Sequence, residues 1–299
     1  MEELQNKKKD NIIKAVIYSL LAATCFSIMA LFVKFVAHNV DNNLIVFFRF
    51  GVSFLYILGV VFFKNVILKK NQINLKTTIF KLHFLRAVAS TFSMLLLYYS
   101  LAYISLVDAN LLFMTSPLFV FLIGLIFLRK RKDLLHIIAV ILGFIGVAFV
   151  LKPTASLFNP KAIYALLTGF STAVAFLLIR KISKKDNHYV SLFYYFLLAF
   201  SFSGIISIFR WSHIDWNNIY YLFLIGIFGT AFQEFLIRAS TYASAKITSS
   251  LLYFSVLISA IFSFIFFNYS LVFFDYLGIL LVCSSGIIIV TIQPDFRNH

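Results

Sequence analysis

Long apolar segments are the feature that most constrains this chain. Each is 18 to 24 residues long, and they fall at 14–37, 43–63, 84–104, 107–128, 134–151, 161–180, 189–209, 218–238, 247–267 and 274–292. About 20 apolar residues are enough for one helix to cross the hydrocarbon core of a bilayer. Because that core offers no water, each segment must satisfy its own backbone hydrogen bonds, as a helix does. The sequence therefore predicts an all-α integral membrane protein with ten transmembrane helices.

Composition excludes the main alternative classes. The chain is 62% hydrophobic and 12% charged, whereas soluble domains average about 45–50% and about 25%. Disorder, a secreted disulfide scaffold and a nucleic-acid module are all excluded. Cys25 and Cys283 lie in apolar segments and form no Cys-x-x-Cys pair, so neither a disulfide framework nor a metal site is expected.

The positions of the basic residues predict the orientation. If the N-terminus is cytoplasmic, 20 of the 26 lysines and arginines lie on the cytoplasmic side and only Lys152, Lys161 and Arg210 lie on the other. Such an excess marks the cytoplasmic side of a membrane protein. Both termini are therefore expected in the cytoplasm, with the chain in the cytoplasmic (inner) membrane. The net charge of +15 is assigned to membrane lipid headgroups, not to nucleic acid.

An internal repeat divides the chain into two halves. A shift of 139 residues superposes 103–127 on 242–266 with seven identities, among them Tyr103 with Tyr242 and Ser116 with Ser255. Five spans per half would place the second half upside down relative to the first. We therefore expect two inverted five-helix repeats, 1–152 and 153–299, an architecture by which transporters open alternately to either side.

Arginines and lysines inside the spans are candidate functional residues, because an ionisable group at the centre of a span costs at least about 2.5–3.5 kcal/mol. Arg49 is deep in the second span and belongs either to a solute pathway or helix-positioning network, or to the interface. Arg86, near the inner end of the third span, could contact headgroups or attract a solute. Lys34 is close enough to the outer end of the first span to reach headgroups.

Glu234 is the only carboxylate well inside a span, and Arg238 follows on the same helix face four residues later. A pair at this spacing stabilises a helix. Two interpretations stay open: a charge pair that neutralises itself near the cytoplasmic face, and a proton site whose pairing changes during turnover.

Uncharged polar residues gather on two hairpins. They either bond helix to helix or line a solute cavity, and the candidates are Tyr99, Asn110, Ser116, Gln233 and Tyr253. Pro117 removes a backbone hydrogen bond from the fourth span, where a broken helix could bind a solute or act as a gate, although packing alone also tolerates proline.

Small residues mark the last span of each half. Their stripes allow close helix approach, either within the monomer or in a homodimer; they comprise Ala139, Gly143 and Gly146, and Gly278, Ser285 and Gly286. The chain has no Gly-rich phosphate loop, His-Glu-x-x-His or Gly-x-Ser-x-Gly motif, so neither an enzyme nor a cofactor is expected.

Several short motifs resemble those of the EamA family of the drug/metabolite transporter superfamily. They are Phe47-Phe48-Arg49-Phe50, Leu85-Arg86-Ala87, and Tyr98-Tyr99-Ser100-Leu101-Ala102-Tyr103-Ile104-Ser105 running into Ser116-Pro117. Within the family, the first motif, Arg86 and Phe158-Asn159-Pro160 are most similar to the S-adenosylmethionine uptake carriers of obligate intracellular bacteria.

The resemblance implies a central cavity between the halves, lined by the first, third, fourth, sixth, eighth and ninth spans. Arg49 and Arg86 match recurring basic positions, and Tyr99, Asn110, Ser116, Gln233 and Tyr253 would lie near the cavity. The chain departs from the family pattern in its ninth span, which has Val256 opposite Pro117.

These features predict a secondary carrier or exchanger of a small polar metabolite, with S-adenosylmethionine uptake as the leading specific hypothesis. An exporter of amino acids or drugs is the alternative within transport. A non-transporting membrane scaffold or sensor is the alternative from another class.

Overall fold

The structure is a computed structural model, and it describes residues 2–36, 39–67, 73–101, 103, 112–126, 134–151, 159–209, 218–267 and 272–291. All regular secondary structure in these ranges is helical. The helices are α1 (Glu2–Val36), α2 (Asn42–Phe62), the π-helical turn η1 (Phe63–Ile67), α3 (Phe80–Leu101), α5 (Ser116–Ile126), α6 (Leu134–Leu151), α7 (Ala162–Ile182), α8 (His188–Phe209), α9 (Ile219–Tyr242), α10 (Ala245–Leu251), α11 (Phe254–Phe267) and α12 (Phe273–Thr291).

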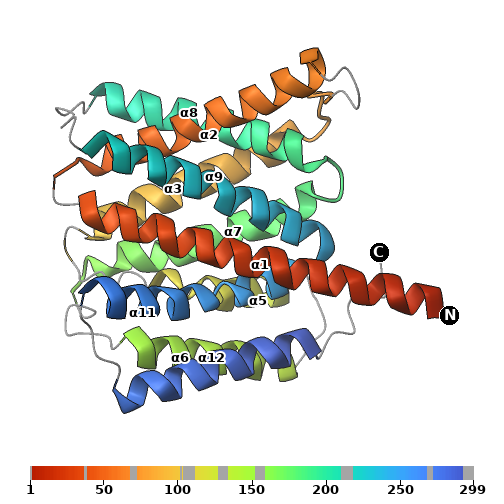
Figure 1. Cartoon of the computed structure of the whole chain (residues 1–299), viewed down its shortest axis with the longest axis vertical. Helices are drawn as coiled ribbons and strands as arrows, with labels where there is room; N and C mark the ends of the chain where they lie inside the picture. Colours follow the sequence, from red (N-terminus) through yellow and green to blue (C-terminus); the bar gives the residue numbers. More distant parts are fainter. Residues whose placement is uncertain are drawn as a thin grey trace.

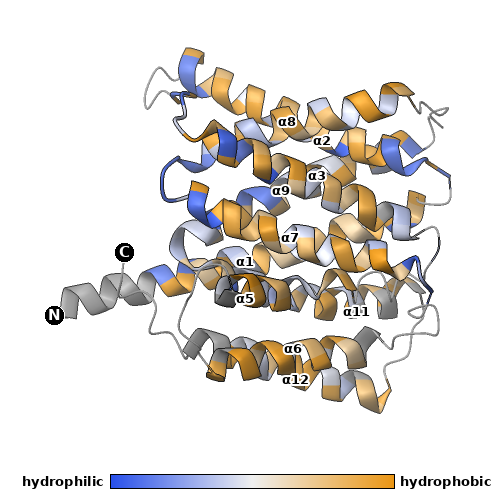
Figure 2. Cartoon of the chain, turned by 180° about the vertical axis from the view of Figure 1, so that it is seen from behind, coloured by the Kyte–Doolittle hydropathy of each residue, from blue (hydrophilic) through white to orange (hydrophobic). Residues whose placement is uncertain are grey.

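Six helical segments in the described ranges are long and apolar enough to cross a membrane. They are Asn11–Val36, Asn42–Ile67, Phe80–Leu97, Ala162–Ile182, His188–Phe209 and Ile219–Tyr242. Shorter apolar helices occupy Ile137–Phe149, Ala245–Ser259 and Tyr276–Ile288. Figure 2 shows the apolar residues along the middle of the helices and hydrophilic residues at their ends. The chain is therefore a multi-pass membrane protein.

The helices run side by side and form two layers. α9, α1 and α11 lie in front in Figure 1, whereas α3, α7 and α5 lie behind them and face the viewer in Figure 2. The pair α2 and α8 closes one edge, and α6 and α12 close the other. α1 begins and α12 ends on the same side of the bundle. We call this side, which carries Lys14, Lys64, Lys81, Lys181 and Arg238, the basic end.

Most helix packing joins the first half of the chain to the second. α1 packs along α9 as α3 packs along α7, α2 packs against α8 and α6 against α12. If each span is exchanged with its counterpart in the other half, the same set of pairs results. The α1–α9 pair becomes the α7–α3 pair, and the α2–α8 and α6–α12 pairs are each converted into themselves. No comparable set of contacts exists within either half of the described chain.

Pro117 lies directly after a break in the fourth span, where a proline disrupts a helix because its N–H is missing and its ring clashes with the carbonyl four residues earlier. Within α5, Pro117 is the second residue, where proline is tolerated because its missing N–H would have no intrahelical acceptor. The helical path is interrupted just before it, at Met114 and Thr115. The break therefore precedes the proline, and Pro117 lies in the first turn of the helix that follows it.

The ninth span is broken at the corresponding place without any proline. α10 ends at Leu251, residues 252 and 253 form a turn, and α11 begins at Phe254. Backbone bonds across the turn reach back three residues, including Tyr253 N–H to Ser250 C=O at 3.1 Å. Ser27 Oγ of α1 donates to Ser255 C=O at 2.8 Å. This bond joins α1 to the first turn of α11, directly after the break.

The small-residue stripes of α6 and α12 pack against each other within one chain. A Cβ added to Gly143 would lie 2.5 Å from Ser285 Oγ, and one added to Gly146 would lie 2.8 Å from Gly278 C=O. Such close approach needs residues without side chains. These stripes hold the α6–α12 pair together, so a homodimer through the last spans, which stays a prediction, would have to use their outer faces.

Candidate functional site

Arg86 of α3 is completely buried and joins three helices. Its Nη1 donates to Ser191 Oγ at 2.7 Å and to Ser191 C=O at 3.1 Å, both on α8. Its Nη2 donates to Gln233 Oε1 on α9 at 3.2 Å. The guanidinium also lies 4.4 Å from the ring centroid of Tyr195. Burial excludes headgroup contact in this conformation and places Arg86 among neutral acceptors inside the bundle.

Arg49 of α2 is buried just as deeply, with 1% of its surface exposed, but its surroundings differ. None of its three guanidinium nitrogens has a hydrogen-bond partner among the described residues. The guanidinium lies 4.8 Å from the ring centroid of Phe50 and against Gly229 of α9. A buried cation without acceptors is costly, so it is a strong candidate for binding an anion.

The two arginines belong to one cluster. The rings of Phe50 and Tyr195 meet edge to face with centroids 5.8 Å apart, and each ring contacts one arginine. Along α9, Gly229 contacts Arg49 and Gln233 contacts Arg86, one helical turn apart. Neither arginine forms an ion pair with a carboxylate in the described ranges. The cluster is therefore a site of uncompensated positive charge.

Hydroxyl groups hold α2 and α9 together beside this cluster. Ser53 Oγ and Thr230 Oγ1 are 2.7 Å apart, and both are buried. Each hydroxyl also lies within hydrogen-bond distance of a carbonyl on its own helix, Ser53 of Arg49 C=O and Thr230 of Gly226 C=O. The hydroxyl that donates across the helices leaves its own carbonyl to the helix, and the other donates to its own. The bond fixes the register of the two helices and thereby holds Arg49 opposite Gly229.

Glu234 and Arg238 form an ion pair one turn further along α9. Glu234 Oε1 accepts a hydrogen bond from Arg238 Nε at 2.8 Å, and His188 Nε2 lies 3.5 Å from the same oxygen. The other oxygen, Oε2, is buried and has no partner among the described residues. The ion pair thus involves Oε1 and leaves Oε2 without a hydrogen bond from any described residue.

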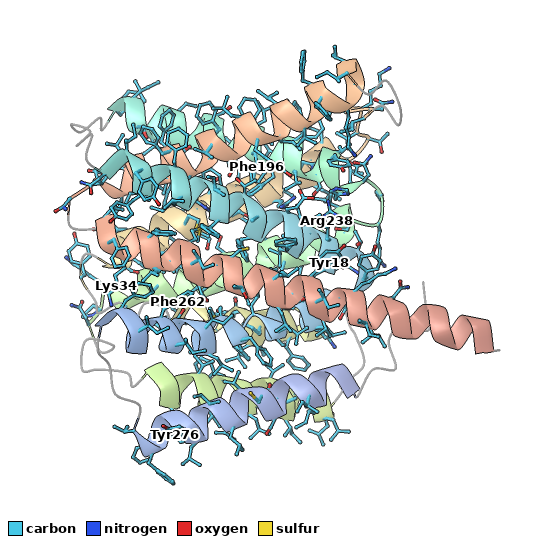
Figure 3. All side chains as sticks on the ribbon, in the orientation of Figure 1. Tyr18, Lys34, Phe196, Arg238, Phe262 and Tyr276 are labelled. Carbon is cyan, nitrogen blue, oxygen red and sulfur yellow. The ribbon has the colours of Figure 1, made fainter. Side chains whose placement is uncertain are left out.

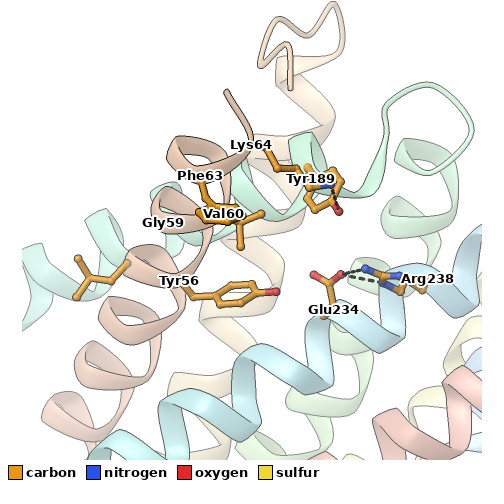
Figure 4. A pocket seen from close by; sticks show the side chains of 9 residues that line it. Tyr56, Gly59, Val60, Phe63, Lys64, Tyr189, Glu234 and Arg238 are labelled. Atoms are coloured by element: carbon orange, nitrogen blue, oxygen red, sulfur yellow. Dashed lines mark hydrogen bonds and ion pairs between the residues drawn. The ribbon is translucent and has the colours of Figure 1, made fainter. Parts of the chain in front are cut away.

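A cavity of about 520 Å³ opens beside this ion pair, between α2, η1, α8 and α9. Figure 4 shows Tyr56 pointing toward Glu234, with Lys64 and Tyr189 at the other side of the opening. The lining residues are Leu55, Tyr56, Gly59, Val60, Phe63, Lys64, Tyr189, Glu234 and Arg238. This cavity is distinct from the central one that the resemblance implies: it shares only the eighth span with that expectation and otherwise lies against the second and seventh.

The remaining described candidate residues lie on α3, on α5 and at the α10–α11 turn. Tyr99 is 44% exposed and contacts the rings of Tyr103 and Tyr164, about 20 Å along α3 from Arg86. Ser116 is buried at the start of α5, and Tyr253 is buried at the α10–α11 turn with an unpartnered hydroxyl. Asn110 lies outside the described residues.

Lys34 is exposed in the last turn of α1. Figure 3 shows it at the opposite end of that helix from Tyr18, which lies near Arg238. The Arg238 guanidinium is 6.0 Å from the Tyr18 ring centroid. Lys34 is therefore far from the cavity, and its exposure distinguishes it from the buried arginines, which makes it a suitable control position.

Sequence reasoning missed several residues that complete these sites. Ser191 and Tyr195 share one face of α8 and surround Arg86, yet an i, i+4 Ser–Tyr spacing in an apolar helix carries no distinctive signal. Gly229 makes room for Arg49. Lys64 appeared only as a loop cation, although its Nζ donates to Tyr189 OH at 2.6 Å inside the bundle.

Comparison with known proteins agrees with this architecture. The family model described as EamA-like transporter family matches residues 13–152 and 159–291. A protein of known crystal structure has the same fold, with a TM-score of 0.77 over 95% of this chain and 99% of that chain at 14% identity.

Two curated relatives carry names that state a transport activity. The S-adenosylmethionine uptake transporter of Rickettsia felis is 26% identical over 250 residues, which cover 84% of this chain and 82% of that protein. The pseudopaline exporter CntI of Pseudomonas aeruginosa is 26% identical over 260 residues, which cover 84% and 87%. The chain belongs to the EamA-like transporter family, a family of membrane transporters and not of enzymes.

Proposed function

We propose that this protein is a secondary carrier or exchanger that binds a carboxylate-bearing metabolite at the Arg49–Arg86 cluster. The observation that carries the proposal is the unpartnered guanidinium of Arg49, buried in the membrane-spanning part of the bundle. Ionisable residues at such depth mark solute pathways. A carboxylate offers two acceptors in the plane that a guanidinium fork requires, so it would remove the cost of the unpaired charge.

The transport mechanism we propose is alternating access between two inverted halves, 1–152 and 153–299. It is supported by helix pairs that stay the same when the halves are exchanged and by matching breaks in the fourth and ninth spans. Broken helices supply local backbone that can rearrange around a fixed site. We further propose ten spans in the inner membrane with both termini in the cytoplasm, which puts the basic end on the cytoplasmic side.

S-adenosylmethionine is the substrate we propose first. It carries a carboxylate for Arg49, a primary ammonium and an adenine that can stack on aromatic rings. Gln233, together with Tyr99, Asn110, Ser116 and Tyr253, is proposed to orient the solute in other stages of the cycle, while Glu234 with Arg238 carries a proton or balances the amino group. Uptake agrees with the name of the Rickettsia relative.

Export is the second candidate, favoured by the relative named as a pseudopaline exporter at the same 26% identity. A carrier that exports would use the same cluster but load from the cytoplasmic side. Direction therefore separates the two candidates, whereas the site does not.

The test is exchange in liposomes. Purified protein would be reconstituted, the vesicles preloaded with unlabelled S-adenosylmethionine, and entry of labelled S-adenosylmethionine measured, with Arg49→Gln compared with Lys34→Gln. We expect entry that depends on preloading, is lost in Arg49→Gln and persists in Lys34→Gln. No entry into vesicles holding folded protein would reject this substrate, and amino acids would be tested next; equal rates in both variants would reject the arginine site.

A further inference from the structure

The cavity between α2, α8 and α9 has its charged side chains toward one end. Lys64, Tyr189 and Arg238 lie toward the basic end of the bundle, where α2 and α9 finish and α8 begins. Leu55 lies nine residues before Lys64, about 13 Å deeper along α2. Between them the lining is Tyr56, Gly59 and Val60 of α2 and Phe63 of η1, which is apolar except for the Tyr56 hydroxyl. A polar mouth above an apolar trough matches a molecule that is itself polar at one end and apolar along its length.

The trough faces the surroundings of the bundle and not its interior. Leu55 is 67% exposed, and Tyr56 and Phe63 are also exposed. In a membrane-spanning helix such residues face lipid chains. A small polar solute would gain nothing from this part of the cavity, whereas an acyl chain fits it. The volume of about 520 Å³ is within the usual range for ligand sites.

The charges at the mouth fit a phosphate. Lys64 Nζ and the Arg238 guanidinium both line the cavity, against the single carboxylate of Glu234. Lys64 belongs to η1, and π-helical turns are frequent at functional sites. Basic pockets between helices near the cytoplasmic surface are typical binding sites for phospholipid headgroups.

Glu234 adds a requirement for a hydrogen-bond donor. Its Oε1 accepts from Arg238, whereas Oε2 is buried and unpartnered among the described residues. Only 8% of the residue is exposed, although it lines the cavity. A buried carboxylate oxygen favours a charged donor such as a primary ammonium.

We propose that this cavity binds a phospholipid of the leaflet at the basic end, with its phosphate held by Lys64 and Arg238, its primary ammonium on Glu234 Oε2 and an acyl chain along Leu55 to Phe63. Phosphatidylethanolamine has this chemistry. Phosphatidylcholine has the same phosphate but a quaternary ammonium that cannot donate a hydrogen bond. The assignment gives Glu234 Oε2 to the lipid ammonium, so while the lipid is bound this oxygen does not balance the amino group of a solute.

Lipid retention by the full-length protein tests the proposal. The protein would be purified in detergent with equimolar phosphatidylethanolamine, phosphatidylcholine and phosphatidylglycerol of identical chains, and bound lipid would be counted by native mass spectrometry. We expect phosphatidylethanolamine to be retained about tenfold over phosphatidylcholine, as the loss of one hydrogen bond to a charged group implies. Equal retention of the two, or a preference for phosphatidylglycerol, would overturn the proposal.

Variants assign each contact. Lys64→Gln should lower retention of all three lipids, and Glu234→Gln should abolish the preference for phosphatidylethanolamine, whereas Lys181→Gln, at the same end on α7, should change neither. Gly59→Leu would project a side chain from a position where no atom of the described residues lies within 4 Å of an added Cβ, and by occupying the trough it should also lower retention. Unchanged retention in Gly59→Leu and Lys64→Gln would overturn the site.

A soluble headgroup separates a lipid from a small phosphate compound. Millimolar O-phosphoethanolamine should fail to displace the retained lipid, because it lacks the acyl chain that the trough binds. Displacement at that concentration would overturn the lipid as the occupant.

Discussion

Arg49 and Arg86 are equally buried, yet the bundle treats them differently. Arg86 donates to Ser191 and Gln233 and lies over Tyr195, so two partner helices satisfy most of its donors. Arg49 belongs to α2 and contacts α9 one helical turn away from the Arg86 contact. It lies beside the Phe50 ring and Gly229 and has no acceptor among the described residues. Arg86, whose Nη atoms are bonded and whose Nε alone has no partner among the described residues, holds helices in place, whereas Arg49 retains its capacity to bind.

From the sequence, Arg49 and Arg86 are both ionisable candidates inside spans. Their different surroundings assign a mainly structural role to Arg86 and a mainly binding role to Arg49. Replacing Arg86 should cost mainly stability, because its acceptors would be left without donors. Replacing Arg49 should mainly lower the transport rate without lowering stability, because the guanidinium has no hydrogen bond to a described residue that the replacement would break. Measuring both properties on each variant tests the distinction.

The largest expected effect is that of Arg49→Met on transport. Losing one member of a close charge pair with the solute carboxylate is expected to reduce the exchange rate at subsaturating solute by about 30-fold or more. The melting temperature in detergent should stay equal or rise, since an unpaired buried charge has been removed. A variant that melts well below wild type would show that Arg49 is a structural residue.

Arg86→Met should show the opposite balance. Ser191 and Gln233 would lose their donor, at a cost of about 1–3 kcal/mol, and the melting temperature should fall. Ser191→Ala should lower it by less, because Arg86 keeps Gln233 and the backbone carbonyl. If Arg86→Met melts like wild type while transport is lost, the two arginines share one role and the comparison fails.

Gly229→Ala tests whether the space beside Arg49 matters. The added Cβ would lie 2.8 Å from Arg49 Nε and 3.2 Å from Met29 Sδ, so the flexible guanidinium must shift. We expect the apparent KM to rise by about fivefold to tenfold, as overpacking costs imply. Gly124→Ala is the matched control, because no described atom lies within 4 Å of its added Cβ. Equal KM values for the two variants would show that the space at Gly229 does not affect solute binding.

Thr230→Val should have the smallest effect. It removes one interhelical hydrogen bond, that with Ser53, at an average of about 0.6 kcal/mol for such bonds. A slightly lower melting temperature and a nearly normal KM are expected. A large rise in KM would mean that the α2–α9 register, and not the guanidinium alone, determines binding.

The sequence predicted the membrane class and drew attention to both arginines, because apolar length and charge in lipid are local properties of the chain. It also predicted that Glu234 and Arg238 share a helix face, since i, i+4 spacing alone determines that. It could not predict that Ser191 and Tyr195 surround Arg86, because the rotation of α8 depends on packing between halves. Nor could it place Tyr99 at the far end of α3 from Arg86.

The helix break of the ninth span was beyond sequence reasoning for another reason. Proline is a visible signal of a break, and Val256 gives none. At Leu252 and Tyr253 the backbone instead forms three-residue hydrogen bonds, and Ser27 of α1 bonds to the first turn of α11 beside them. Only the internal repeat, which aligns the ninth span with the fourth, could have suggested the break. In the fourth span, too, the break lies just before Pro117.

The pairing of helices across the two halves has a consequence for biosynthesis. When α3 leaves the ribosome, the acceptors of Arg86 are still untranslated, since Ser191 and Gln233 follow 105 and 147 residues later. Until α8 and α9 insert, the nascent arginine must find headgroups or another protein, and α1, α3 and α6 lack their main neighbours. Neither half should persist alone in a membrane, whereas two separately expressed halves meeting in one bilayer should assemble into the complete bundle.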